Sequence, residues 1–519
     1  MGNSISICIT SDVHGYLVPT NYRDDQKENI GLAKLTTVIN RIKNKQPTLL
    51  IDNGDFLQGS PFTYYFAKYY EHLPSPIIDV YNYLQYDAVI LGNHEFNYGL
   101  DYLQKCMKHS QFPWLSSNIL NKDTEKPYFG VPYVIKMIEG RKIAIIGVTT
   151  HYIPNWEDPK HIEKLLFEDA VKATKKWVNY VKNKESPDVI IVSYHGGLEK
   201  DPDTGAETEL LTGENQGYQI CEEIADIDVL ITGHQHRKLI ATIHNKTVIQ
   251  TGSKGSALGE IKMEWDKANN LLINCAIHEL DECVEENKDI MHLLSKNERK
   301  VQEWLDKPIA LVEGEMTITN PFQARIEEHP FIEYVNTLQM QVANVSISCT
   351  ALFDNESKGF PQHITMRDIV SNYIYPNTLK VLRLLGQDIK DALEKSASYF
   401  AIENGELTIN PSFHTPKPQH YNYDMWEGIE YELDITRPIG ERVAKLEKNG
   451  RSLNLTETYD VVMNNYRASG GGNYSMFQNK EIVKDIPIDM TVLIADNLLN
   501  RKKIKASVNN NFKVRFTDK

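Results

Sequence analysis

The chain has 519 residues, of which 41% are hydrophobic and 24% charged, and its formal net charge at pH 7 is −14. This length and composition predict a globular protein with two or three domains of about 100 to 200 residues each. The net negative charge argues against a protein that binds the phosphate backbone of a nucleic-acid polymer. We therefore expect a small molecule as its partner.

Two features of the sequence bear on its compartment. The cysteines lack Cys-x-x-Cys spacing and predict free thiols in a reducing environment rather than a disulfide framework or a zinc knuckle: Cys8, Cys106, Cys221, Cys275, Cys283 and Cys349. No apolar run approaches the roughly 18 residues of a membrane-spanning helix, and the N-terminus lacks a basic region followed by an apolar core. We expect a cytoplasmic protein with no membrane partner, or an extracytoplasmic one if a signal peptide has been removed.

The first half of the chain alternates between strand-like and helix-like segments. Strands are predicted at 4–10, 48–52, 88–91, 189–193 and 229–232. Helices with apolar residues near helical spacing are predicted at 31–43, 62–71, 76–84, 100–108, 167–182 and 215–224. A hairpin is expected at 131–138 and 142–148, and further strands at 239–243, 247–250 and 259–265. This alternation predicts a layered α/β domain with its helices on the outside.

The loop from Leu91 to Gly99, with the sequence LGNHEFNYG, follows one of these strands directly. Gly92 lets the backbone turn there, so Asn93 and His94 are expected on a tight loop aimed by the strand. An amide oxygen beside an imidazole offers one hard ligand and one titratable group. Taken alone, such a loop is more often structural, so a functional interpretation depends on what else meets it.

Polar residues also follow four other predicted strands. The polar residues at these strand ends are Asp12, His14, Asp52, Asn53, Asp55, Asn93, His94, His195, His234 and His236. Ligands collect at the carboxyl ends of strands in α/β sheets, so these loops are expected to converge on one crevice. Carboxylates, an amide and imidazoles suit Mn²⁺, Fe, Zn²⁺ or a mixture of them, and suit Ca²⁺ poorly. Because the set contains no cysteine, it does not look like a structural zinc site.

The ordered motifs DVH at 12–14, GD at 54–55, GNHE at 92–95, YHGG at 194–197 and GHQH at 233–236 resemble the signature of the calcineurin-like metallophosphoesterases. The resemblance implies two metal sites that share Asp55. One set of implied ligands is Asp12, His14, Asp55 and His236, and the other is Asp55, Asn93, His195 and His234. His94 would bind no metal and would face the phosphoryl group of the substrate.

The implied chemistry is hydrolysis of a phosphoester. Two divalent ions about 3.5 to 4 Å apart can activate a shared water for attack on phosphorus and clamp the phosphoryl oxygens. His94 could donate a hydrogen bond to the developing oxyanion, or a proton to the leaving oxygen. In many nucleotidases of this family an Asp three residues after this His orients it. Here the residue is Asn97, so either the pairing is neutral or another group orients His94.

A charged segment at 279–307 separates the two halves of the chain, and its apolar residues recur at helical spacing. We expect a catalytic domain at 1–283, a linker helix at 284–307 and a C-terminal domain at 308–519. In the C-terminal half, helices are predicted at 330–344 and 388–400, and strands at 378–384, 428–435 and 458–464. Residues 410–424 are too rich in proline to form a helix.

Aromatic residues beside amides and glycines mark the second half, in YPNTL at 375–379 and NNYRASGGGNY at 464–474. This half resembles the C-terminal specificity domain of the 5′-nucleotidase family. Together with YNYD at 421–424, these segments are most similar to its 2′,3′-cyclic-nucleotide 2′-phosphodiesterase/3′-nucleotidase branch. The resemblance implies that Tyr375 and Tyr474 sandwich the base, that Asn377 contacts it, and that Arg325 lies near the substrate. Each aromatic stack on a base is worth about 1 to 3 kcal/mol.

The resulting hypothesis is a dinuclear-metal phosphoesterase with a layered α-β-β-α catalytic domain and an α+β domain that selects a nucleotide. The nearest alternative is a 5′-nucleotidase or UDP-sugar hydrolase of the same family. A phosphatase for a non-nucleotide ester and a non-catalytic nucleotide- or metal-binding protein are more distant alternatives. The sequence does not predict the identity of the metals, the preferred base or the oligomeric state.

Overall fold

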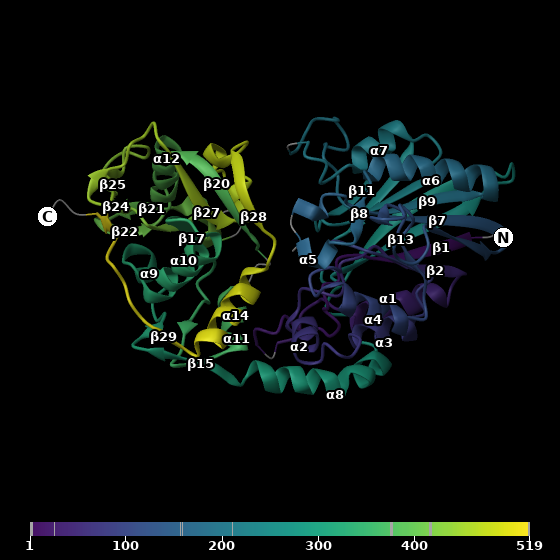
Figure 1. Cartoon of the computed structure of the whole chain (residues 1–519), viewed down its shortest axis with the longest axis horizontal. Helices are drawn as coiled ribbons and strands as arrows, with labels where there is room; N and C mark the ends of the chain where they lie inside the picture. Colours follow the sequence, from purple (N-terminus) through teal and green to yellow (C-terminus); the bar gives the residue numbers. More distant parts are fainter. Residues whose placement is uncertain are drawn as a thin grey trace. The chain divides into compact units, whose positions relative to one another are not determined.

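The computed structural model describes residues 4–24, 26–155, 157, 159–209, 211–373, 377–414 and 418–516. The chain divides into two compact units, shown in Figure 1. The N-terminal unit extends to Gln302 without residues 22–24, and the C-terminal unit contains residues 22–24 and the chain from Glu303 onward. The division falls within helix α8 (Lys288–Leu305), whose stripe of Ile290, Leu294, Val301 and Leu305 is fully or almost fully buried.

Two six-stranded sheets form the centre of the N-terminal unit. The first sheet contains, in spatial order, β14 (Leu271–Glu279), β13 (Ala257–Trp265), β1 (Ser4–Thr10), β2 (Thr48–Asp52), β3 (Ala88–Ile90) and β4 (Trp114–Leu115). The second contains β11 (Lys238–Ile243), β12 (Lys246–Thr251), β10 (Val229–Thr232), β9 (Val189–His195), β7 (Arg141–Thr149) and β6 (Tyr133–Ile138). Strands β1 to β4 run parallel to one another, and so do β7, β9, β10 and β12.

One apolar core lies between the two sheets, because it takes residues such as Ile7 and Ile51 from the first sheet and Ile145 and Ile191 from the second. A second core covers the other face of the second sheet beneath α6 (Ala170–Glu185) and α7 (Gly217–Glu223). Helices α1 (Leu32–Lys43), α3 (Ile77–Leu84) and α4 (Leu100–His109) lie on the outer side of the first sheet (Figure 1). The predicted α-β-β-α layering is therefore confirmed.

Several predicted boundaries shift for local reasons. The helix predicted from residue 167 begins at Ala170, because the Asp169 side chain accepts a hydrogen bond from the Lys172 backbone N–H and caps it. Strand β9 continues to His195, two residues past its predicted end, because it stays paired with β7 as far as Thr149. Strand β14 was not predicted, since its apolar residues are interrupted and most of its side chains are only half-buried.

The C-terminal unit is an α+β fold around a mixed five-stranded sheet. Its strands are, in spatial order, β23 (Asp424–Glu427), β17 (Ile347–Ala351), β27 (Thr458–Asn464), β20 (Leu379–Leu385) and β28 (Glu481–Ile486). Helix α10 (Pro330–Ala343) packs on β17 and β23, and α12 (Gly386–Ala397) packs on β20. A four-stranded sheet adds β26 (Arg451–Ser452), β25 (Val443–Lys448), β24 (Glu430–Asp434) and β30 (Phe512–Arg515).

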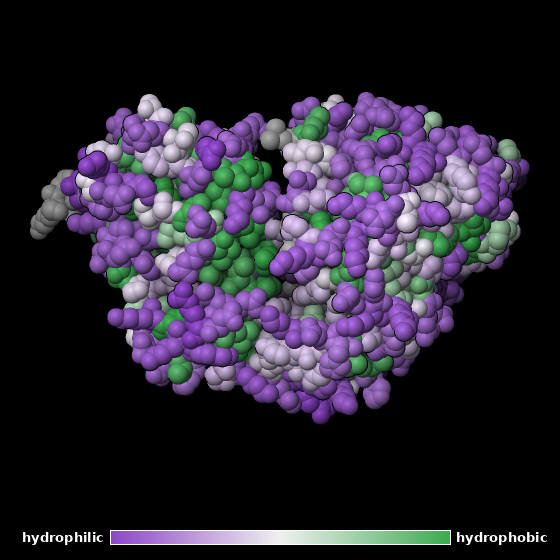
Figure 2. Space-filling model, viewed as in Figure 1, coloured by the Kyte–Doolittle hydropathy of each residue, from purple (hydrophilic) through white to green (hydrophobic). Residues whose placement is uncertain are grey.

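The visible surface of both units is mostly hydrophilic, and apolar side chains gather over the part of the C-terminal unit that contains the edge strand β28 (Figure 2). Ile482 and Val483 of this strand are 45% and 38% exposed. None of the helices in the described ranges is long and apolar enough to cross a membrane. All six cysteines are free thiols, as predicted, and four of them are buried.

Candidate metal centre

The seven candidate ligands lie in loops or at strand ends on the carboxyl edge of the two sheets. Asp12 and His14 follow β1, Asp55 follows β2, Asn93 follows β3, His195 ends β9, and His234 and His236 follow β10. Because β1, β2 and β3 are parallel, as are β9 and β10, the ends of these strands meet at common edges. The convergence predicted from the sequence is therefore present in the fold.

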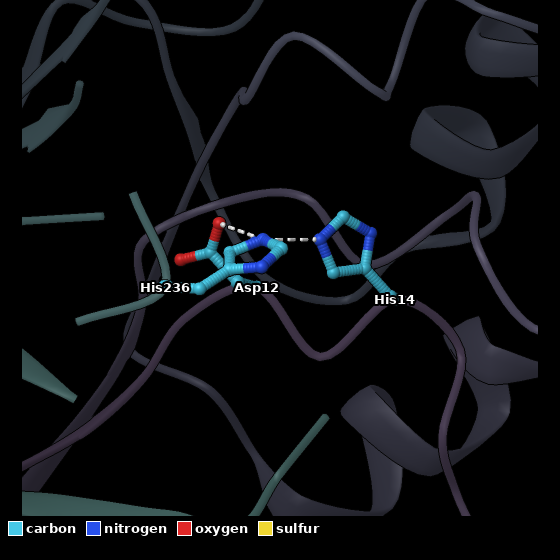
Figure 3. Close-up of side chains that lie close together, drawn as sticks. All are labelled: Asp12, His14 and His236. Atoms are coloured by element: carbon cyan, nitrogen blue, oxygen red, sulfur yellow. Dashed lines mark hydrogen bonds and ion pairs between the residues drawn. The ribbon is translucent and has the colours of Figure 1, made fainter. Parts of the chain in front are cut away.

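Asp12, His14 and His236 form one group, in which the three side chains point toward one another (Figure 3). His14 Nε2 lies 3.0 Å from His236 Nε2, which lies 3.5 Å from Asp12 Oδ1. His14 Nδ1 is 2.8 Å from the carbonyl oxygen of Gln58, which can only accept a hydrogen bond. This contact places the proton on Nδ1 and turns the lone pair of Nε2 toward the group.

Asp55, His195 and His234 form the second group, with Asn93 among them. His195 Nε2 is 3.0 Å from Asp55 Oδ2 and 3.2 Å from Asn93 Oδ1, while His234 Nδ1 is 2.9 Å from the same amide oxygen. His195 Nδ1 donates to the carbonyl oxygen of Asn53 at 2.7 Å, so Nε2 faces inward. The structure thus brings all seven residues together in two groups, and the bridging role of Asp55 stays a prediction.

The backbone is strained at most of these residues. Five of the seven candidate ligands have left-handed φ angles: Asp12 (53°), His14 (49°), Asp55 (60°), His234 (65°) and His236 (57°). Residues other than glycine adopt this conformation uncommonly and at a cost, and such outliers cluster at functional sites. Their concentration here indicates a backbone shaped to aim these side chains at common points.

Glu95 joins two of the loops, a role that was not predicted from the sequence. Its carboxylate is 2% exposed and accepts four backbone N–H groups, from Asp55 (2.9 Å), Phe56 (2.9 Å), Leu57 (3.1 Å) and Gly92 (2.6 Å). It therefore ties the loop after β2 to the loop after β3. These loops approach so closely that a Cβ at Gly92 would collide with Asp55 Oδ1. In the sequence, the only indication of this role was that Glu95 is the last residue of the GNHE motif.

Electrostatics favour positive charge at the centre. Burial raises the pKa of Asp55, but the nearby imidazoles of His195 and His94 outweigh it and lower that pKa well below its usual value. Burial likewise opposes a charge on His195, yet the Asp55 carboxylate raises its pKa to about 10. The pKa of His14 falls to about 3 through burial and repulsion by His236, which keeps its imidazole neutral. The buried carboxylates thus attract positive charge, as a proton on His195 or as metal ions.

The donor set fits divalent cations. It combines buried carboxylates with an amide oxygen and imidazoles, and backbone carbonyl oxygens fix the ring orientation of His14 and His195. Oxygen and nitrogen donors of this kind suit Mn²⁺, Zn²⁺ and iron.

His94 lies beside the centre and is half-buried. Its backbone N–H donates to Asp55 Oδ1 at 2.8 Å, and its ring centroid is 5.2 Å from that of His14. Its Nδ1 lies 2.7 Å from Asn97 Oδ1. The structure therefore brings the predicted pair of His94 and Asn97 together at the edge of the metal-ligand groups.

The residues predicted to contact the nucleotide in the C-terminal unit differ in their burial and hydrogen bonds. Tyr375 lies outside the described residues. Asn377 is half-buried, and its carbonyl oxygen accepts the Met490 backbone N–H at 2.9 Å. Arg325 is fully buried, and its guanidinium donates to the carbonyl oxygens of Pro321, Leu352 and Asp354 and to Asn355 Oδ1. Arg325 thus braces neighbouring loops, and its predicted contact with substrate stays a prediction that this arrangement does not support.

Tyr474 is a core residue of the C-terminal unit, with no exposed surface. The Arg467 guanidinium lies 3.9 Å from its ring centroid, and the Phe477 ring stacks on it at 5.7 Å. Its hydroxyl group is 2.8 Å from Ser396 Oγ and donates to the carbonyl oxygen of Asn422 at 3.1 Å. A base could stack on this ring only after Arg467 or Phe477 moved, so the predicted stacking on Tyr474 stays a prediction that this arrangement does not support.

The fold and the site define the class of protein as a metal-dependent phosphoester hydrolase. Residues 5–238 match the model of the calcineurin-like phosphoesterase family, and residues 309–479 match that of the 5′-nucleotidase C-terminal domain. A Staphylococcus aureus protein named as a 5′-nucleotidase, solved in complex with α-ketoglutarate, is 38% identical, with a TM-score of 0.73 over 99% of this chain and 100% of that one. The chain belongs to the 5′-nucleotidase family. Calcineurin-like members use a dinuclear metal centre, and this chain has candidate ligand groups for one.

Curated relatives extend over nearly the whole chain. The 2′,3′-cyclic-nucleotide 2′-phosphodiesterase/3′-nucleotidase of Haemophilus influenzae is 28% identical over 98% of this chain and 86% of its own length. The trifunctional nucleotide phosphoesterase of Bacillus subtilis is 27% identical over 98% of this chain, which spans only 39% of that protein. Human 5′-nucleotidase is 24% identical over 96% of this chain and 89% of its own length.

Replacing Glu95 tests whether its carboxylate shapes the centre. In Glu95→Gln an NH₂ group faces backbone N–H donors, so we expect a loss of about 2 kcal/mol or more in the free energy of unfolding. We also expect Mn²⁺ affinity to fall by at least about tenfold, since partners that orient ligands have effects of this size. Urea unfolding and equilibrium dialysis measure the two quantities.

Glu199→Gln is the matched control. Glu199 is 3% exposed and accepts the backbone N–H groups of Tyr218 and Gln219 in α7. This variant should lose stability while keeping its affinity for Mn²⁺. Equal Mn²⁺ affinity in the two variants would contradict the role given to Glu95.

Proposed function

We propose that the protein hydrolyses nucleotide phosphoesters, opening 2′,3′-cyclic nucleotides and removing 3′-phosphates. The observation that carries the proposal is the meeting of seven candidate ligands and His94 at the carboxyl edges of the two sheets, in a chain that also has a nucleotidase C-terminal domain. The relatives from Haemophilus influenzae and Salmonella typhimurium that bear this activity in their names are 28% and 27% identical.

The proposed metal sites follow the two groups. Asp12, His14 and His236 would hold one divalent ion, Asn93, His195 and His234 the other, and Asp55 would contact both. Bound there, a pair of Mn²⁺, Zn²⁺ or iron ions would supply Lewis acidity to the phosphoryl oxygens and lower the pKa of a water.

His94 would donate a proton to the leaving oxygen or a hydrogen bond to the phosphoryl group. Asn97 Oδ1 can only accept, so it holds the proton on His94 Nδ1 at 2.7 Å. Nε2 is then the atom that takes up a second proton and delivers it to the leaving oxygen of the nucleotide, or donates a hydrogen bond to a phosphoryl oxygen. The short backbone contact of His94 with Asp55 keeps this imidazole beside the metal-ligand groups.

We include Tyr466 among the base contacts. It is 42% exposed, whereas Tyr474 in the same segment is fully buried. The backbone N–H of Asn465 donates to the carbonyl oxygen of Thr378 at 2.9 Å, so Tyr466 lies close to the segment that contains Asn377. An exposed ring beside an amide side chain can stack on a base while the amide bonds to its edge.

A specific observation favours a second candidate. The 38% identical Staphylococcus aureus protein is named as a 5′-nucleotidase, so hydrolysis of 5′-monophosphates or UDP-sugars is the alternative. The same two-domain fold could serve either substrate, because the position of the phosphate on the ribose is read by contacts with the sugar and the base.

Hydrolysis of 2′,3′-cyclic AMP, 3′-AMP, 5′-AMP and UDP-glucose distinguishes these candidates. The purified protein should lose activity after chelation, regain it with Mn²⁺ and prefer the first two substrates. His94→Ala should lower kcat by about 10² to 10⁴ because it removes the proton donor.

His109→Ala is the control, since His109 is exposed and pairs with Asp79 at 2.8 Å on the surface. It should leave kcat unchanged. A preference for 5′-AMP or UDP-glucose would replace the proposal with the alternative, and full activity of His94→Ala would contradict the role of His94.

Tyr466→Ala tests base recognition. Loss of one stack, about 1 to 3 kcal/mol, should raise KM for 3′-AMP by roughly 5- to 150-fold. Hydrolysis of phenyl phosphate, which has no base, should be unchanged. Tyr474→Phe keeps the ring and removes its hydroxyl hydrogen bonds, so it should lower thermal stability without raising KM. An unchanged KM in Tyr466→Ala would place the stacking surface on another residue.

A further inference from the structure

A chain of hydrogen bonds leads from His94 away from the metal-ligand groups. His94 Nδ1 lies 2.7 Å from Asn97 Oδ1, and Asn97 Nδ2 donates to Glu157 Oε2 at 2.7 Å. Glu157 Oε1 in turn lies 2.8 Å from His161 Nδ1. Asn97 is thus held at both ends of its amide, by an imidazole on one side and by a carboxylate on the other.

We propose that Glu157 is the positioning residue for His94 and supplies, through Asn97, the carboxylate that Asn97 itself does not provide next to the imidazole. The inference rests on the proposed function, in which His94 transfers a proton or a hydrogen bond to the substrate. Among the described residues, the Glu157 side chain bonds to Asn97 and His161, and it reaches His94 through Asn97. It acts by fixing which way the Asn97 amide faces.

The physical reason is the asymmetry of an amide. Asn97 can present either its oxygen or its NH₂ group to His94 Nδ1, and these two orientations demand opposite imidazole tautomers. An ionised carboxylate accepts hydrogen bonds only, so Glu157 holds Nδ2 of Asn97 on its own side. The amide oxygen then faces His94, the proton stays on Nδ1, and Nε2 is left for the substrate.

The surroundings of Glu157 fit this role. It is 8% exposed, and a buried carboxylate is stable only beside donors or positive charge. Asn97 and His161 supply these partners, one from the loop after β3 and the other from α5 (Pro159–Ile162). The Glu157 backbone N–H donates to the carbonyl oxygen of Ile153 at 3.0 Å, which anchors this part of the loop.

The direction in which Asn97→Asp changes kcat distinguishes this role of Glu157 from a general structural role. Asn97→Asp creates the His–Asp pair of the family, yet its new carboxylate would face that of Glu157 at hydrogen-bonding distance. Two carboxylates at such a distance repel unless they share a proton. Asn97→Asp should therefore lower kcat in the wild-type protein and raise kcat in the Glu157→Gln variant.

The test is a double-mutant cycle of Asn97→Asp and Glu157→Gln, with kcat and KM measured at saturating Mn²⁺. In Glu157→Gln the side-chain amide can rotate and release Asn97, so kcat should fall by about 10- to 100-fold at unchanged KM. Asn97→Asp should also lower kcat. The double variant should exceed each single variant by at least about tenfold, a strongly non-additive result.

Glu199→Gln is the control for loss of a buried carboxylate and should keep wild-type kcat. Thermal melting and Mn²⁺ stoichiometry are recorded for every variant. Glu157→Asp keeps a carboxylate and should lower kcat less than Glu157→Gln does. If Glu157→Gln fails to fold, Glu157→Ala takes its place in the cycle. Wild-type kcat in Glu157→Gln, or effects that simply multiply in the double variant, would overturn the proposal.

The cycle is measured with 3′-AMP and with phenyl phosphate. If the nucleotide assignment is wrong, the wild-type protein is inactive on 3′-AMP while it still hydrolyses phenyl phosphate, and the cycle is then evaluated on that substrate. Failure of the proposed function is thereby separated from failure of the role given to Glu157.

Discussion

Two buried carboxylates, those of Asp12 and Asp55, impose the constraint that the rest of the N-terminal unit meets. Each is at most 1% exposed, and buried negative charge is stable only beside positive charge or hydrogen-bond donors. The imidazoles around them compensate part of this negative charge. The donor set suits divalent cations, which would compensate the rest. Parallel strands bring the loops together, left-handed backbone conformations aim the side chains, and Glu95 ties two of the loops into one unit.

The chemistry proposed for this site divides the work between side chains that face the phosphate and side chains that hold them in place. His94 lies next to the ligand groups, and its orientation depends on an amide and a carboxylate farther out. In the proposed function the C-terminal unit recognises the base, and there the ring of Tyr466 is exposed while that of Tyr474 is buried. Mutations in the two units should therefore separate turnover from recognition of the base.

Local sequence patterns predicted those strands and strand-end motifs that depend on neighbouring residues in the chain. The bounds predicted for β1, β2, β10 and β27 agree with the structure, because each is a short run of mainly apolar residues. The seven candidate ligands and His94 were identifiable since each sits in a short motif at a strand end. Glu95 stands in the GNHE motif, but its role and that of Glu157 could not be predicted, because they depend on which backbone and side-chain donors surround the two carboxylates. Glu157, for example, is 60 residues from Asn97. The burial of Tyr474 likewise depends on Arg467, which Asp424 holds in place at 2.6 Å.

The number of divalent ions bound per chain is the most direct measure of the central claim. Equilibrium dialysis against Mn²⁺, followed by elemental analysis, should give two ions per wild-type chain. His14→Ala and His195→Ala should each lose one ion, and Asp55→Ala should lose the tight binding of both. A stoichiometry of one or none in the folded wild-type protein, or two ions retained in Asp55→Ala, would contradict a dinuclear centre built on these residues.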